Sequence, residues 1–161
     1  MPNAPFVPET FAVPTAVESD GFRLELLGPQ HNEADHNAWM SSIPEIRSTP
    51  GFGAGWPPAA GMTLAENLAD LRSHEDRSAR HVDFAYTVMD AGSGVIIGCV
   101  YINPPAGDDQ ADAVVRSWVT GGSADRDEAL TRAVGSWLSE AWPFRAVRYR
   151  VGLEPALIRH G

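Results

Sequence analysis

An uninterrupted apolar run, Val95 to Ile102, limits this chain to few architectures, because only Gly98 interrupts its large apolar side chains. Successive side chains of a strand point to opposite faces, so a strand formed by this run is apolar on both faces and belongs inside a sheet. Phe84 to Met89 shows a second strand pattern, and the turn-forming residues 90–94 lie between the two. We therefore expect a hairpin whose second strand is central.

Apolar periodicity predicts the other elements. Thr63 to Glu66 has the S/T-x-x-E form of a capping box, so a helix is expected to begin there. Pro44 is expected to break or kink the helix before it, and Pro143 to close the last one. The expected strands are 22–26, 84–89, 95–102, 113–119 and 147–151, and the expected helices are 32–47, one from 63 with Leu64, Leu68 and Leu71 on one face, and one with the apolar stripe Leu130, Val134, Trp137, Leu138 and Ala141.

The chain has 161 residues, 43% of them hydrophobic, which suits one compact core. Its beginning carries prolines at positions 2, 5, 8 and 14 without a lasting period, so little regular structure is expected there. We expect a proline-rich N-terminal arm over residues 1–20 and a single domain over residues 21–161.

Charge and cysteine content narrow the partners and the compartment. The net charge is -9, with 12 Lys and Arg against 21 Asp and Glu, so nucleic acid and anionic membrane surfaces are poor partners. Cys99 is the single cysteine and lies in the apolar run, so no intramolecular disulfide is expected. No basic leader and no apolar stretch near the ~20 residues of a membrane span is visible. These features favour a cytoplasmic protein.

Two patterns resemble those of the GCN5-related N-acetyltransferase (GNAT) superfamily: the segment Gly98 to Ile102, and the spacing from Trp118-Val119 to Leu130 and Trp137. The resemblance covers roughly residues 22–152. It implies an α/β fold with a mixed, mostly antiparallel, twisted sheet of about five strands and three helices. Because members carry a further helix and closing strands, and Pro155 stands in the short tail, the fold is expected to be reduced at the C-terminus.

The resemblance implies transfer of an acetyl group from acetyl-CoA to a small-molecule or peptide amine. The pyrophosphate of acetyl-CoA would lie on a loop R/Q-x-x-G-x-G/A at a helix N-terminus, where unpaired N–H groups and glycines admit phosphate. In this chain the Arg/Gln position falls on Gly122 and the two glycines fall on Asp125 and Asp127. The cofactor-binding candidates implied by the resemblance are Trp118, Val119, Thr120, Gly121, Gly122 and Arg126.

The same stretch has a second interpretation as an ordinary capped helix start. Asp125 would be the N-cap and Glu128 would lie three residues on, as in a capping box. Acids there oppose a bound anion. The alternative function is therefore a catalytically inactive GNAT-fold module that binds a ligand or a protein. In that case the last strand, 147–151, would be an exposed edge, and a homodimer is expected to form through it.

The catalytic candidates are Asp112, as a base, and Tyr101. Each has a plainer interpretation, Asp112 as a turn carboxylate and Tyr101 as strand packing. His31, His36, His74 and His81 do not have the spacing of a zinc site, so no metal is expected. In the loop 48–61, Phe52 and Trp56 are the aromatic residues that could face a ligand.

Overall fold

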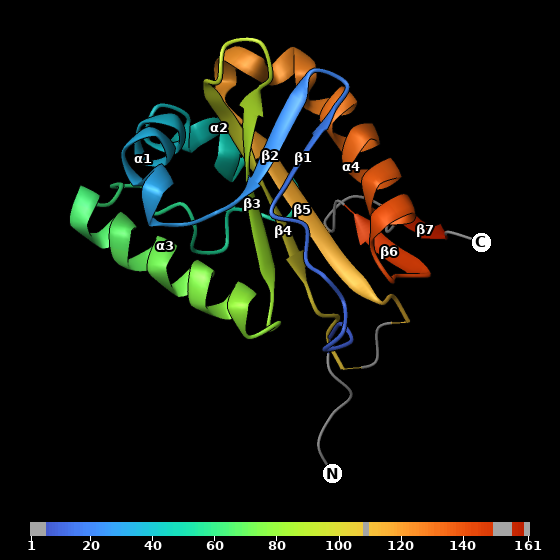
Figure 1. Cartoon of the computed structure of the whole chain (residues 1–161). Helices are drawn as coiled ribbons and strands as arrows, with labels where there is room; N and C mark the ends of the chain where they lie inside the picture. Colours follow the sequence, from blue (N-terminus) through green and yellow to red (C-terminus); the bar gives the residue numbers. More distant parts are fainter. Residues whose placement is uncertain (1–5, 108–109, 150–155, 160–161) are drawn as a thin grey trace.

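We describe the protein from a computed structural model, which describes residues 6–107 and 110–149, and residues 156–159 as backbone only. Within these residues seven strands form one sheet in the order β1-β2-β3-β4-β5-β6-β7. Helices α1, α2 and α3 cover one face of the sheet and α4 covers the other (Figure 1). The strands are β1 Ala16–Ser19, β2 Phe22–Leu26, β3 Phe84–Asp90, β4 Ile96–Asn103, β5 Ala113–Val119, β6 Ala146–Tyr149 and β7 Ala156–Arg159. The helices are α1 Asn32–Met40, α2 Ile43–Arg47, α3 Leu64–Ala79 and α4 Asp127–Ala141, with the short 3₁₀ helices η1 Pro29–His31 and η2 Gly121–Arg126.

The apolar run forms the middle of this sheet, as predicted. β4 pairs antiparallel with β3 on one side and with β5 on the other. All its residues from Ile96 to Ile102 are buried, because α4 and the α1–α3 group each cover one of its faces. A side-chain carbon at Gly98 would clash with the carbonyl oxygen of Trp118, so glycine permits the close approach of β4 and β5.

Two apolar clusters flank the sheet. The cluster under α4 contains the helix residues Leu130, Val134 and Leu138, which confirms the predicted stripe apart from the exposed Ala141. The cluster under α1 and α3 contains Trp39 and Trp118, both without exposed surface. The sequence predicted one core, and the sheet divides it into two.

The helix expected over 32–47 is two helices. The chain leaves helical geometry at Ser42, and α2 then begins with Pro44 in its first turn. Proline is tolerated there because an N–H group in the first turn has no partner within the helix, so no hydrogen bond is lost. The break at this proline was predicted. It gives the chain four α-helices in its described part instead of three.

The capping box of α3 is confirmed, but one residue of its predicted apolar face, Leu64, is not buried. Leu64 is 45% exposed, whereas Asn67 is 1% exposed and turns toward α1. The buried side of α3 therefore starts with a hydrogen-bonding residue rather than a leucine.

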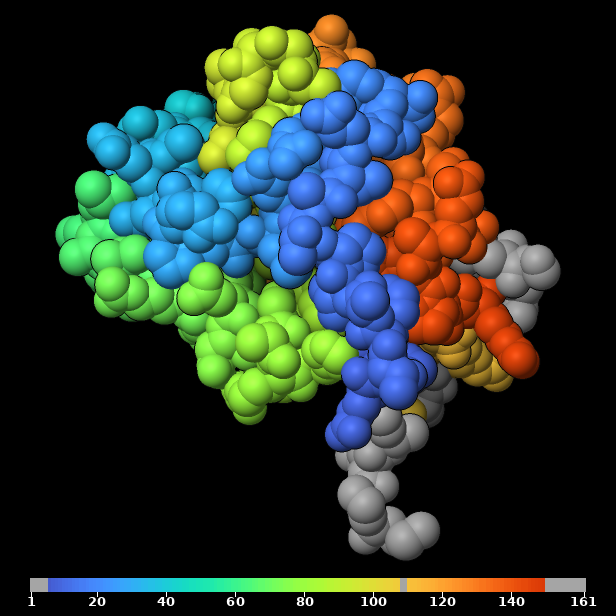
Figure 2. All heavy atoms as spheres, viewed as in Figure 1, coloured from blue at the N-terminus to red at the C-terminus, as the bar shows by residue number. Residues whose placement is uncertain are grey.

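The N-terminal segment is more ordered than its prolines suggest. Residues 6–15 form no helix or strand, as expected, but residues 16–19 form β1, an edge strand antiparallel to β2 that was not predicted. Val7 has no exposed surface and belongs to the cluster under α4. Figure 2 shows the blue N-terminal segment lying across the molecule between the green α3 and the orange α4. The expected sheet of five strands lacked this strand.

The C-terminal end also differs from expectation. β6 is parallel to β5 on one side and pairs antiparallel with β7 on its other side. A closing strand therefore does form, and β6 is not an edge strand, so the basis of the predicted homodimer through 147–151 is wrong. Val147 and Tyr149 are buried as predicted, while residues 150–151 of the expected strand and the expected turn at 108–109 lie outside the described residues. No helix in the described part is long and apolar enough to cross a bilayer.

Candidate functional site

The strands β5 and β6 run parallel to each other. Their described register runs from Ala113 opposite Val147 to Val115 opposite Tyr149. β5 continues four residues further, to Val119, while the chain that follows Tyr149 lies outside the described residues as far as residue 155. Ligands of open α/β sheets bind where parallel strands separate at their carboxyl ends. The end of β5 is therefore the first place to look for a site.

The main chain of β5 alternates between its two neighbours. The N–H of Thr120 donates to the carbonyl oxygen of Ile97 at 2.8 Å, on the side of β4. Alternation along an antiparallel ladder then turns the N–H and C=O groups of Ser117 and Val119 the other way, toward the β6 side of β5. On that side no partner strand is described beyond Tyr149, and we call this edge of β5 the gap. The Ser117 hydroxyl lies 2.7 Å from the Tyr149 hydroxyl, where the described part of β6 ends.

The loop after β5 leads into the start of α4. Gly121 donates its N–H to the Ser42 hydroxyl at 2.9 Å and packs against Glu45, so the α1–α2 break holds this glycine. A side-chain carbon at Gly122 would meet no atom within 4 Å, so its backbone is open to a ligand. One of the two glycines is thus engaged and the other is accessible.

Comparisons with solved structures find proteins of similar fold. A ribosomal-protein-S5-alanine acetyltransferase from Vibrio fischeri is similar with a TM-score of 0.64 and 16% identity, over 83% of this chain and 72% of that one. A ribosomal L7/L12 alpha-N-protein acetyltransferase in complex with coenzyme A has a TM-score of 0.65 at 12% identity, over 83% and 73%. A microcin C7 self-immunity acetyltransferase in complex with acetyl-CoA and AMP has a TM-score of 0.64 at 12% identity, over 85% and 73%.

This chain has the GNAT fold. No protein-family model and no curated protein sequence matches it. The fold is therefore recognised from its shape, while the identities are too low to carry an activity across.

The start of α4 differs from a GNAT pyrophosphate loop, and also from the capped helix start that the sequence predicted. Residues 121–126 form η2, α4 begins at Asp127, and its N-cap is Arg126 with no side-chain cap. The prediction of Asp125 as N-cap was wrong, because the 3₁₀ turn moves the helix start one residue further on. Asp127 and Glu128 occupy the first turn, where their charges interact favourably with the helix dipole and unfavourably with a bound phosphate.

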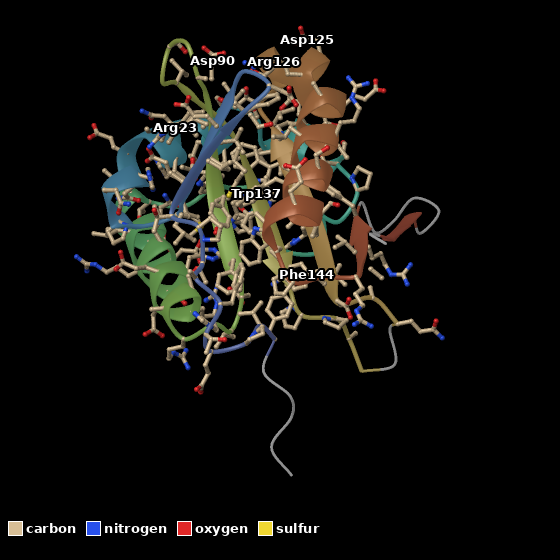
Figure 3. The ribbon with its side chains drawn as sticks, turned by 45° about the vertical axis from the view of Figure 1, so that its right-hand side comes forward. Arg23, Asp90, Asp125, Arg126, Trp137 and Phe144 are labelled. Atoms are coloured by element: carbon tan, nitrogen blue, oxygen red, sulfur yellow. The ribbon has the colours of Figure 1, made fainter. Side chains whose placement is uncertain are left out.

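Arg126 points away from the gap. Its guanidinium donates to a carboxylate oxygen of Asp90 at 2.7 Å and to the carbonyl of Gly21 at 3.2 Å, and it lies 4.4 Å from the ring centre of Phe22. Figure 3 shows Asp90, Arg126 and Asp125 together where α4 begins. Hydrogen bonds from Ser93 and then from Arg126 hold the pKa of Asp90 below its usual value. In this conformation Arg126 anchors the loop to the β3–β4 turn.

The other predicted cofactor residues have mixed positions. The Trp118 side chain is fully buried, and its ring N–H donates to the Tyr101 hydroxyl at 3.2 Å, so it supports the strand from behind. Val119 and Thr120 lie at the gap and at the start of the loop. The structure thus brings Val119, Thr120, Gly121 and Gly122 together, and it separates Trp118 and Arg126 from them.

Asp112 lies at the opposite end of β5. Its carboxylate accepts from the backbone N–H groups of Arg145 at 2.6 Å and of Ala146 at 3.1 Å, and its own N–H donates to the Ala146 carbonyl. These bonds fix the start of β6 beside the start of β5. They place the carboxylate several residues from the carboxyl end of β5.

Tyr101 lines a small polar pocket on the α3 face of the sheet. The pocket has a volume of about 220 Å³ and is lined by Trp56, Asp70, His74, Arg77, Tyr101 and Arg116. We call it the Arg116 pocket. Burial raises the pKa of Tyr101 well above its usual value, so this phenol stays protonated near neutral pH.

The helix residues of the pocket are held in a chain of polar contacts. His74 lies 3.7 Å from the Asp70 carboxylate through Nε2, and its Nδ1 lies 2.9 Å from the Arg77 guanidinium. Burial lowers the pKa of His74. A neutral ring with its proton on Nε2 satisfies both contacts.

Sequence reasoning missed this pocket, although part of it was visible. Asp70, His74 and Arg77 follow each other at four and three residues, the spacing of one helix face. Nothing in the sequence joins that face to Tyr101 and Arg116 on two strands. Of the two loop aromatics, Trp56 lines the pocket and Phe52 contacts Tyr101 edge to face, at 5.8 Å between ring centres.

A second cavity lies outside this site, and the described residues offer no group of metal ligands. A larger cavity of about 550 Å³ lies between β2, the N-terminal segment and α3, and it includes the ion-paired Arg23 and Glu25 but no residue of β5. In the described residues no three His, Cys, Asp or Glu side chains converge as a metal would require.

Proposed function

We propose that the chain is an N-acetyltransferase that uses acetyl-CoA to acetylate an amine. The observation that carries the proposal is the carboxyl end of β5, where the main chain of Ser117 and Val119 is directed toward the gap and the strand leads into the α4 start. Similar structures that contain coenzyme A and acetyl-CoA support it.

The residues at the gap fit the amide-bearing chain of acetyl-CoA better than its pyrophosphate. Main-chain groups of Ser117 and Val119 are suited to an extended amide-bearing chain, which would pair with them as an added strand does. Gly122 is suited to the pyrophosphate because no side chain obstructs its backbone. Acetyl-CoA supplies the acetyl group as an activated thioester. The negative charges of Asp125, Asp127 and Glu128 weaken the binding of the pyrophosphate.

Tyr101 is our candidate for the proton donor to the leaving thiolate, because it is protonated at neutral pH and lines the pocket beside β5. For Asp112 we propose a positioning role, since two backbone N–H groups already occupy its carboxylate. Asp70 lies in the same pocket as Tyr101 and is the acid that an incoming ammonium would meet.

A second candidate is the inactive GNAT-fold module. It is favoured by the acids at the α4 start and by the ion pair of Arg126 with Asp90, which engages the cation of the loop before α4. A protein of this kind would keep the fold and lose affinity for coenzyme A.

Calorimetric titration with acetyl-CoA separates the two. We expect saturable binding, and we expect the double variant Asp125→Asn, Asp127→Asn to bind roughly 3-fold to 30-fold more tightly, because each charge near a helix end is worth about 0.3 to 1 kcal/mol. Glu140→Gln is the matched control, since it removes an acid from the last turn of α4 and should leave the affinity unchanged.

The opposite outcome is equally clear. No heat and no thermal stabilisation at millimolar acetyl-CoA, in the parent and in the double variant, rules out the transferase and favours the inactive module. Equal tightening by Glu140→Gln would show a general charge effect rather than a site.

Assembly and location belong to the same proposal. A homodimer now has to use another surface, since β7 covers β6, and β1 offers a short edge on the other side of the sheet. We also propose a cytoplasmic location on the basis of the single buried Cys99.

A further inference from the structure

Arg116 is placed as a fixed cation on the wall of the Arg116 pocket. Its guanidinium lies 4.7 Å from the ring centre of Phe52 and 4.9 Å from that of Tyr101, and one N–H donates to the Gly51 carbonyl at 3.1 Å. These contacts restrain the planar group on both rings. An arginine held in this way loses little further side-chain entropy when it binds an anion.

No carboxylate of the described residues forms an ion pair with Arg116. Arg23, Arg77, Arg80 and Arg126, in contrast, each pair with an acid. Arg77, the other arginine of the pocket, is paired with Asp83 at 3.0 Å. Arg116 therefore presents the cation of this pocket that a carboxylate could engage in a two-pronged hydrogen bond.

The pocket also offers the opposite charge. Asp70 lines it together with Arg116, and Trp56 and Tyr101 provide aromatic walls. A volume of about 220 Å³ is below the ~300 Å³ at which drug-sized sites begin, so it admits a group of about the size of one amino acid. A site with one acid, one free guanidinium and aromatic walls suits a small group that carries both an amine and a carboxylate.

Its position connects it with the gap. Arg116 directly follows Val115, the last residue of β5 in the described register with β6. The pocket wall and the start of the gap are thus consecutive residues of one strand. An acceptor bound by Arg116 would lie beside the strand segment that the proposed function assigns to the acetyl donor.

We propose that the Arg116 pocket binds a carboxylate of the acceptor, so that the acetylated amine belongs to a free amino acid or to the acidic first residue of a peptide. This inference rests on the proposed function, because only a transferase has an acceptor. The shared chemistry is an ammonium group with a carboxylate a few bonds away.

The test uses the full chain without coenzyme A and follows the Trp56 indole N–H by NMR, assigned with Trp56→Phe. One arm compares L-alanine with L-alaninamide, and the other compares the dipeptide amide Asp-Ala-amide with Asn-Ala-amide. We expect the carboxylate member of at least one pair to bind at least about 10-fold more tightly, because a lost charge-assisted bond is worth about 1.5 kcal/mol or more. The arm that responds identifies the source of the carboxylate.

The variants locate the effect. Arg116→Gln should abolish the preference, and Arg116→Lys should keep only part of it, because an ammonium lacks the planar fork. Arg72→Gln, an exposed site on α3 outside the pocket, should change nothing. If Arg116→Gln loosens the 48–61 loop, the partial loss in Arg116→Lys still carries the test.

Equal binding of acid and amide in both arms, or an unchanged preference in Arg116→Gln, overturns the proposal. Carboxylate-selective binding in a protein that shows no affinity for acetyl-CoA would instead overturn the proposed function and leave the pocket as a ligand site. The two failures are therefore distinguishable.

Discussion

Single buried polar side chains determine how α1 meets α3. Asn67 donates to the Asp35 carboxylate at 3.1 Å and accepts from the Trp39 ring N–H at 3.0 Å. Asp35 is 4% exposed and Asn67 is 1% exposed. Burial raises the pKa of Asp35 to about 6, since one amide bond does not replace its lost hydration. The contact is specific, and burial of the ionised Asp35 carboxylate lowers the stability of the folded protein in a pH-dependent way.

This penalty predicts how stability changes with pH. The folded protein holds a proton on Asp35 up to pH about 6 and the unfolded chain only to about 3.8, so the folded state binds more protons in between. The free energy of unfolding therefore falls as pH rises through this window, by at most about 3 kcal/mol. Asp35→Asn should lack the fall, as measured by urea unfolding at several pH values between 4 and 7.

Asp76→Asn is the control for this experiment. Asp76 lies on α3 with a side chain 63% exposed, and its replacement should leave the shape of the pH profile unchanged. Parallel profiles for the parent and Asp35→Asn would contradict the assignment.

At the scale of elements, contacts at the ends of the helices determine how each helix begins and which side it turns to the sheet. Thr63 accepts from the Glu66 N–H at 3.1 Å, and Glu66 accepts from the Thr63 N–H at 2.9 Å. These reciprocal bonds begin α3 and fix the rotation that aims Asp70, His74 and Arg77 at the sheet. α4 has no such cap, and Arg126 holds its start from the side instead.

Removing the α3 cap should lower stability by about 1 kcal/mol, the usual value of an N-cap hydroxyl. The variant is Thr63→Ala, and urea unfolding measures the change. Glu66→Gln is its matched partner, because glutamine also closes a capping box, and its loss should be smaller. A Thr63→Ala protein as stable as the parent would show that tertiary packing alone sets the start of α3.

At the scale of the whole molecule, the N-terminal segment packs against aromatic residues of the cluster under α4. Phe6 lies 5.9 Å from Phe84 and 5.4 Å from Phe144 between ring centres, and Phe11 lies 5.1 Å from Trp142. The Tyr86 hydroxyl donates to the Pro14 carbonyl at 2.7 Å. The segment is thus part of the packed structure from residue 6 onward.

Val7→Ala should therefore destabilise the whole fold by roughly 1.5 to 3 kcal/mol, from lost burial and a residual cavity. Val95→Ala removes the same atoms from a residue that is 57% exposed, and it should change stability by less than about 0.5 kcal/mol. Thermal unfolding of both variants measures the difference. Equal melting temperatures would mean that the arm contributes nothing to the fold.

The sequence by itself determined the elements that local chemistry specifies. The apolar run of β4, the capping box at Thr63, the stripe of α4 and the stop at Pro143 depend on residues close together in the chain, so period and capping were enough. β1 escaped prediction because its four residues have no period of their own and gain their hydrogen bonds only from β2.

The tertiary structure alone decided the site. Arg116 and Tyr101 meet Asp70 because β4, β5 and α3 pack together, and Ser42 reaches Gly121 across 79 positions of sequence. The position of Arg126 depends on Asp90, 36 residues away, rather than on the loop that contains it. Side chains from separate elements acquire a shared environment only when the sheet forms, and no local pattern encodes that environment.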